Sequence, residues 1–118
     1  MSDVVLGPGS ARSEGASVLA LYLLVGGFIG PLVEEIFFRG LIQQLIRQSF
    51  GAFTTILAST ALFVAVHALN ASGVHPVTHV VGGLLFAVLY EKSRSVIAPF
   101  IVHASGNAAM ILLDRFMR

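Results

Sequence analysis

The chain has 118 residues, of which 56% are hydrophobic and 11% are charged, with a net charge of +1 and no cysteine. One domain at most fits this length, and because globular domains carry about 25% charged residues, a mean hydropathy of +0.89 predicts a polytopic membrane protein rather than a soluble one. Lack of cysteine excludes disulfides and thiolate metal sites, and a low net charge without a basic run argues against a nucleic-acid partner.

The N-terminal part is predicted to be a flexible tail over residues 1–16, followed by one transmembrane helical core over residues 17–118. The tail contains Gly7-Pro8-Gly9-Ser10 and few apolar residues. It lacks the basic-then-apolar layout of a signal peptide, so we expect no cleavage.

The first expected helix runs from about Ser17 to Gln48. At about 1.5 Å per residue it measures about 48 Å, more than a bilayer core of about 30 Å. It must therefore tilt, kink or protrude. A kink is expected between Gly26 and Pro31, because proline removes a backbone donor; a break into two shorter helices there is the alternative.

Three further apolar segments follow and are predicted to be spans: Phe53–Leu69, Pro76–Tyr90 and Val96–Leu113. A turn at residues 49–51, a polar loop at 70–73 and a charged loop at 91–94 connect them. The fold class is therefore all-α, a transmembrane helix bundle of about four spans. We expect a multi-pass protein of a prokaryotic cell membrane, in contact with lipid.

Charged residues inside the first span are the strongest functional signal. A charged side chain at mid-bilayer costs roughly 2.5–3.5 kcal/mol on insertion scales, so each one is a functional hypothesis. Glu35 and Arg39 are four residues apart and can pair on one helical face. We interpret this pair as structural rather than catalytic, because a buried ion pair mainly prevents an uncompensated charge. Glu34 points about 100° away and has no partner on its own helix.

The other spans contribute a few polar groups. His67 follows Phe63 by four residues in the second span, and His103 shares a helical face with Asn107 in the fourth. Each alone is explained by an interhelical hydrogen bond. Antiparallel spans place Glu34 and His67 at similar depth, so we expect the four polar groups to converge on one cavity.

Two more histidines, His75 and His79, stand near the start of the third span. Their spacing of four residues suits a metal. The loop before them lies across the membrane from the 49–51 turn, so both are predicted to lie near the opposite interface, away from Glu34.

The chemistry that this set supports is hydrolysis. Glu34 can act as a general base, and His67 can hold the same water or ligate a metal that acidifies it. His103 and Asn107 can donate to the oxyanion of an attacked carbonyl. No cysteine and no serine in a nucleophile elbow is present, which favours direct attack by water.

Three motifs in successive spans resemble the signatures of the CPBP family of intramembrane metalloproteases: Glu34-Glu35-x-x-x-Arg39, Phe63-x-x-x-His67 and His103-x-x-x-Asn107. This family comprises the CAAX prenyl proteases and the bacteriocin-processing proteins, and is also called the Abi family. The resemblance covers about Leu19 to Leu113. It implies a helical membrane fold with a lipid-facing cavity and a peptide or lipidated protein as substrate.

The resemblance also implies roles for residues. Glu34 is the base, His67 holds the water, and His103 and Asn107 form the oxyanion site. Glu35, Arg39 and Phe63 support them. The resemblance leaves open whether a divalent metal such as zinc, held by Glu34, His67 and His103, or the glutamate alone activates the water.

Two other function classes stay open. One is a non-catalytic membrane partner, or a bacteriocin self-immunity protein, that retains the motifs. The other is a metal-handling membrane protein that uses His67, His75, His79 and His103. Family members usually have more spans before the first motif. The alternatives are a minimal core, a truncated chain, or a missing wall supplied by a second copy in a homo-oligomer or by a partner subunit.

Overall fold

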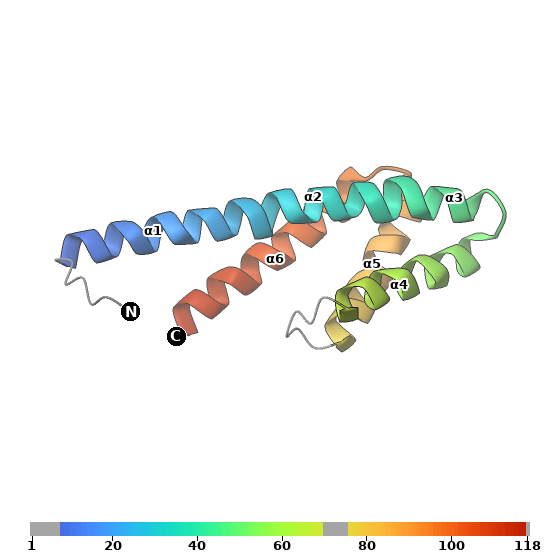
Figure 1. Cartoon of the computed structure of the whole chain (residues 1–118). Helices are drawn as coiled ribbons and strands as arrows, with labels where there is room; N and C mark the ends of the chain where they lie inside the picture. Colours follow the sequence, from blue (N-terminus) through green and yellow to red (C-terminus); the bar gives the residue numbers. More distant parts are fainter. Residues whose placement is uncertain (1–7, 70–75, 118) are drawn as a thin grey trace.

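The computed structural model describes residues 8–69 and 76–117, which form helices joined by short turns (Figure 1). A long rod comprises α1 (Pro8–Leu24), α2 (Gly30–Glu35) and α3 (Gln44–Arg47), linked by the π-helical segments η1 (Val25–Ile29) and η2 (Ile36–Gln43). Three separate helices follow: α4 (Ala52–Leu69), α5 (Pro76–Ser93) and α6 (Ile97–Met117). The all-α fold class predicted from the sequence is confirmed.

The rod begins earlier than the predicted first helix. It starts at Pro8, whereas a flexible tail was expected up to Ala16. Proline suits a first helical turn, and a helix formed in the apolar segment extends outward at little cost per added residue. The predicted tail thus includes the first residues of α1, and the division into a tail over residues 1–16 and a core over 17–118 stays a prediction.

The rod is unbroken where a kink or a break was expected. The N–H of Gly30 donates to the carbonyl of Val25, five residues back, and Pro31 follows without a donor. The proline is thus accommodated by a π turn, and Figure 1 shows a gently curved rod rather than two helices. A second π segment, η2, starts directly after Glu35 and contains Arg39 and Gln43.

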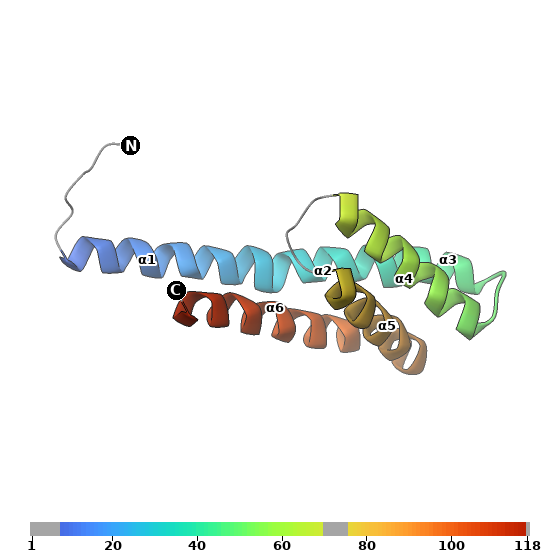
Figure 2. The same ribbon diagram turned by 90° about the horizontal axis from the view of Figure 1, so that it is seen from below.

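The other helices pack along the rod (Figures 1 and 2). The chain turns after Arg47, and α4 runs back beside η2 and α3. α5 packs on α4, and α6 lies along η1 and α2. α5 lies close against α4 at Gly83, where an added Cβ would lie 3.0 Å from Thr60 Cγ2. A larger residue at position 83 would crowd Thr60. The close packing lets the carbonyl of Gly83 accept a hydrogen bond from Arg39 on the rod.

Three of the described helices are long and apolar enough to cross a membrane: Gly15–Arg47, Ala52–Leu69 and Ile97–Met117. α5, predicted as the third span, is not among them, because polar residues occupy both of its ends. Glu91 and Lys92, predicted in a loop, lie in its last turn. The helix closes at Arg94, which has a φ of 55° and donates its N–H to the carbonyl of Tyr90, a left-handed C-terminal cap.

Burial is inverted relative to a soluble protein. Large apolar side chains on every helix are exposed, for example Tyr22, Leu57 and Ile101, whereas Glu35, Arg39 and Gln43 are completely buried. Lipid can cover the apolar exterior, and the buried charges of Glu35 and Arg39 pair with each other inside. The helices therefore build a polar interior between the rod, α4, α5 and α6.

Candidate active site

Glu35 and Arg39 form the ion pair predicted from their spacing. Arg39 Nε lies 3.4 Å from Glu35 Oε2, and Arg39 Nη1 donates to Glu35 Oε1 over 3.4 Å, with both side chains fully buried. Arg39 Nη2 also donates to the carbonyl of Gly83 on α5 at 2.9 Å. Its guanidinium carbon lies 4.9 Å from the Phe63 ring centroid, a cation–π distance. Arg39 thus ties the rod to both α4 and α5.

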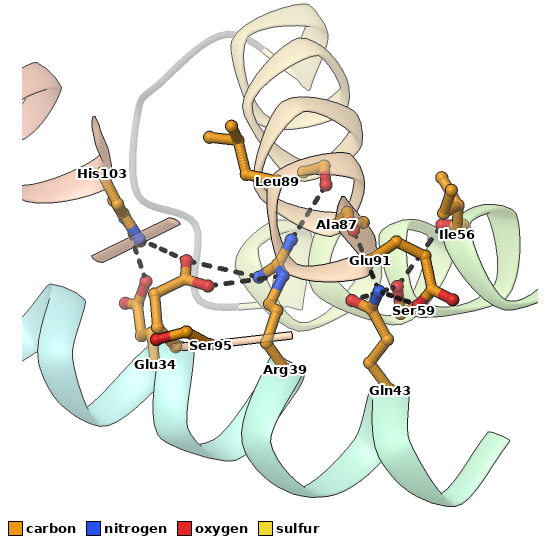
Figure 3. A network of polar contacts seen from close by, with 12 residues as sticks. Glu34, Arg39, Gln43, Ile56, Ser59, Ala87, Leu89, Glu91, Ser95 and His103 are labelled. Atoms are coloured by element: carbon orange, nitrogen blue, oxygen red, sulfur yellow. Dashed lines mark hydrogen bonds and ion pairs between the residues drawn. The ribbon is translucent and has the colours of Figure 1, made fainter. Parts of the chain in front are cut away.

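Glu34 points to a different part of the interior, as its position one residue before Glu35 requires. Its Oε2 lies 3.5 Å from His67 Nε2 and 3.4 Å from His103 Nε2. Figure 3 shows His103 pointing toward Glu34 on the rod. The Glu34 side chain is 35% exposed, so it is accessible where Glu35 is not. Three of the four predicted site residues therefore meet at one carboxylate oxygen.

In each imidazole, Nδ1 is the ring nitrogen that does not face Glu34, and it is hydrogen-bonded to an oxygen. His67 Nδ1 lies 2.7 Å from the carbonyl of Phe63, and His103 Nδ1 lies 2.7 Å from Glu35 Oε1. A carbonyl or carboxylate oxygen can only accept, so both Nδ1 atoms carry the hydrogen. In the neutral rings this leaves an Nε2 lone pair facing Glu34.

Such an arrangement is suited to hold a water. Glu34 Oε2 and a neutral Nε2 are both acceptors, and neither can donate to the other across 3.4–3.5 Å. A water about 2.8 Å from Glu34 Oε2 and from either Nε2 can donate a hydrogen to each. The geometry thus matches a general base with a second group orienting its water.

Aromatic rings fix the two imidazoles from the side. The Phe86 ring stacks on His103, with centroids 4.5 Å apart and planes inclined by 15°. The Phe63 ring lies 4.1 Å from that of His67. Phe63 is 2% exposed and also supplies the carbonyl that His67 binds, so it supports the site in two ways.

The prediction for His79 is wrong. Its ring centroid lies 4.5 Å from that of His67, so it borders the site rather than the opposite interface. The reason is that α4 ends at Leu69, only two residues after His67, and α5 begins at Pro76. The first turns of α5 therefore lie beside the end of α4, at the depth of the site. His75 lies outside the described residues.

Asn107 lies one helical turn from His103, and its amide contacts the rod rather than Glu34. Asn107 Nδ2 donates to the carbonyl of Gly26 at 3.0 Å. The helical donors for this carbonyl are diverted: the N–H of Gly30 goes to Val25, and Pro31 has none. The Asn107 amide therefore satisfies a carbonyl left open by the π turn, and its second N–H can serve another acceptor.

We expect Asn107→Ala to lower the free energy of unfolding by about 1–3 kcal/mol, because the carbonyl of Gly26 loses its donor in an apolar surrounding. Pro31→Ala in the same chain restores an N–H to the rod and should recover part of the loss. Thermal unfolding in detergent measures both. Ser105→Ala, exposed on the same helix, is the control and should change stability by less than about 0.5 kcal/mol. Equal stability of Asn107→Ala and Ser105→Ala would contradict the assignment.

Sequence reasoning missed a second polar layer next to the site. Gln43 is fully buried, donates to the carbonyl of Ala87 at 3.0 Å and accepts from Ser59 Oγ at 3.4 Å (Figure 3). Glu91 in turn pairs with Arg47 and Arg94. The missed signal is a four-residue spacing of polar residues along one face of the rod: Glu35, Arg39, Gln43 and Arg47.

The same residues were also predicted as metal ligands. Glu34, His67 and His103 are donors of the type that zinc prefers. Within residues 8–69 and 76–117, however, no group of three or more His, Asp or Glu side chains is arranged to hold a metal ion. Ligation of a metal by Glu34, His67 and His103 stays a prediction.

A hollow separate from the site lies between α1 and α6. It has a volume of about 650 Å³ and is lined by residues that include Tyr22, Ile111 and Arg115. None of Glu34, His67, His103 and Asn107 lines it. The site is thus defined by its polar groups and not by this groove.

Comparison with known proteins agrees with the motifs and the geometry. The family model described as "Type II CAAX prenyl endopeptidase Rce1-like" matches residues 16–109. The chain belongs to this family. All three motifs lie within the matched range. With three apolar helices long enough to span a bilayer, the protein is a multi-pass membrane protein.

One curated relative is "Putative membrane peptidase YdiL" of Bacillus subtilis (strain 168). It is 28% identical over 94 residues, which is 80% of this chain and 37% of the relative. The chain therefore spans just over a third of the length of that protein. No solved structure gives a significant match. Family and relative together support a CAAX-protease-like function.

Proposed function

We propose that this chain forms the hydrolytic site of an intramembrane endopeptidase in which Glu34 activates water. The observation that carries the proposal is the position of Glu34 Oε2, 3.5 Å and 3.4 Å from the Nε2 atoms of two imidazoles that are each anchored through Nδ1. A structural ion pair would not need two histidines that are each hydrogen-bonded through Nδ1. A water-activating base does, because its water must be oriented.

In the proposed reaction the water lies against Glu34 and His67. Glu34 takes a proton from the water as the oxygen forms a bond to the carbonyl carbon of the substrate. The carbonyl oxygen becomes an oxyanion. Glu34 then delivers the proton to the leaving nitrogen, the C–N bond breaks, and a carboxylic acid and an amine are released. No covalent enzyme intermediate forms.

His103 and Asn107 are proposed to stabilise the oxyanion. His103 bonds Glu35 through Nδ1, and the proposed oxyanion role requires a second hydrogen on Nε2, which then donates into the site. The second N–H of Asn107 is the other donor, while the first is bonded to Gly26. Removing one such donor typically lowers kcat by about 10²–10³-fold.

The substrate is proposed to be a peptide segment reached from the bilayer, on a lipidated or a membrane-embedded protein. The exterior of the helices around Glu34 is apolar. Two of its side chains, Val33 and Phe37, are 59% and 48% exposed, respectively. Lipid covers such surfaces, so a substrate held in the membrane approaches the site by lateral diffusion.

The test is cleavage of a peptide library by the purified protein in lipid vesicles, with each peptide present both unmodified and prenylated. Mass spectrometry in ¹⁸O-labelled water should show one ¹⁸O atom in each new carboxyl terminus. Added hydroxylamine should give no hydroxamate, since there is no acyl-enzyme for it to intercept. A hydroxamate product would overturn direct attack by water. Peptide binding without any cleavage would favour the non-catalytic partner instead.

The glutamate mechanism is tested by the metal content of the purified protein. We expect hydrolysis to survive prolonged chelation, and the metal per chain to stay far below one. Loss of activity on chelation, restored by zinc, would show that Glu34, His67 and His103 are metal ligands in the working enzyme.

A further inference from the structure

His79 is a half-buried side chain in the first turns of α5 that lies outside the three family motifs. Its ring centroid is 4.5 Å from that of His67, with the planes inclined by 36°. It also lies edge-on to Phe63 at 6.1 Å. His67, Phe63 and His79 therefore form one aromatic cluster that joins the end of α4 to the start of α5.

The two imidazoles of the site are held in parallel ways. His103 is bonded at Nδ1 by Glu35 and covered on its ring face by Phe86, a residue of α5. His67 is bonded at Nδ1 by the carbonyl of Phe63 and contacted by His79, also a residue of α5. α5 thus supplies one ring to each imidazole.

His67 needs this second contact more than His103 does. Its side chain is 15% exposed, against 7% for His103, and it stands two residues before the end of α4. Helix ends fray and are less restrained by packing. Phe63 holds His67 through its carbonyl and through a ring 4.1 Å away. The ring of His79 further limits rotation of the imidazole about the hydrogen bond, a rotation that would move Nε2 away from Glu34.

We propose that His79 is a positioning residue that holds the ring of His67 in the orientation that aims Nε2 at Glu34. This inference rests on the proposed function of His67 as the group that orients the water. His79 acts through its ring face, so an aromatic ring of another type can replace it.

The first test does not depend on activity. The chain contains four histidines, so ¹⁵N-histidine labelling with single substitutions assigns each imidazole by NMR in micelles. Native His67 should show one tautomer, with hydrogen on Nδ1. His79→Leu, which keeps bulk but removes the ring, should give a mixture of tautomers at His67, and His79→Phe should restore the single tautomer. Val81→Ala, a 60% exposed position of the same helix, is the control and should leave the spectrum unchanged.

The second test is kinetic. His79→Leu should lower kcat by about 10–100-fold, the range found when a supporting contact of a site is removed, with KM within about threefold of native. His79→Phe should stay within about threefold in both constants. A native His67 spectrum in His79→Leu, equal loss in the Phe and Leu variants, or a raised KM with unchanged kcat would each overturn the positioning role. If the native chain cleaves nothing, the proposed function fails, while the tautomer of His67 still decides the role of His79.

Discussion

Glu34→Gln is expected to lower kcat/KM for peptide hydrolysis by about 10²–10⁴-fold, the contribution typical of a general base. Glutamine keeps the size of the side chain but cannot take a proton from water. Its amide can still donate to the Nε2 atoms of His67 and His103, which lie 3.5 Å and 3.4 Å from the native oxygen, so the fold should stay intact. Initial rates on a cleaved library peptide, with thermal unfolding alongside, measure the two effects separately.

Glu91→Gln is the matched control, since it makes the same chemical change at a glutamate of α5 that pairs with Arg47 and Arg94. It should leave kcat/KM within about threefold of native. Retention of activity within tenfold in Glu34→Gln would remove Glu34 from the role of base, whatever the fate of the control.

Arg39→Ala is expected to lower the free energy of unfolding by about 3–5 kcal/mol, because it leaves the Glu35 carboxylate buried without its cation. It also removes the hydrogen bond to the carbonyl of Gly83 and the contact with the ring of Phe63. The loss should exceed that of Glu34→Gln, whose side chain is partly exposed. Denaturant unfolding in mixed micelles provides the measurement.

A double-mutant cycle separates the pair from the other contacts of Arg39. Arg39→Ala with Glu35→Ala should recover part of the loss, since no unpaired charge remains. Arg47→Ala, on the same rod but 39% exposed at its side chain, should cost only about 0–1 kcal/mol. A double variant no more stable than Arg39→Ala alone would show that the ion pair contributes no coupling.

Glu35 connects the ion pair with the candidate site, because its carboxylate contacts both Arg39 and His103. One of its oxygens bonds Arg39 and also accepts from His103 Nδ1. The buried cation thus fixes the carboxylate that fixes the imidazole beside Glu34. The adjacent glutamates are thus placed differently: Glu34 is partly exposed beside two imidazoles, and Glu35 is buried against Arg39 and His103.

Local spacing explains how much was predictable from the sequence. The pairing of Glu35 with Arg39 follows from the helical repeat within one continuous rod, and so does the divergence of Glu34. The ends of α4 and α6 lay within a few residues of the predicted limits, because apolar runs and turn residues delimit them. Three motifs in three apolar segments were enough to predict the family.

Contacts between helices were not predictable, because they depend on where each helix ends and on how the helices cross. The ends of α4 at Leu69 and of α5 at Pro76 agree with the prediction, but only the packing of α5 on α4 places the ring of His79 4.5 Å from that of His67. Asn107 bonds Gly26 only because a π turn before Pro31 diverts the helical donors of that carbonyl. The sequence by itself determined the membrane class, the helices and which side chains share a face of each. The tertiary structure alone decided which faces meet, because interhelical register is set by packing such as that at Gly83 and not by the spacing along one helix.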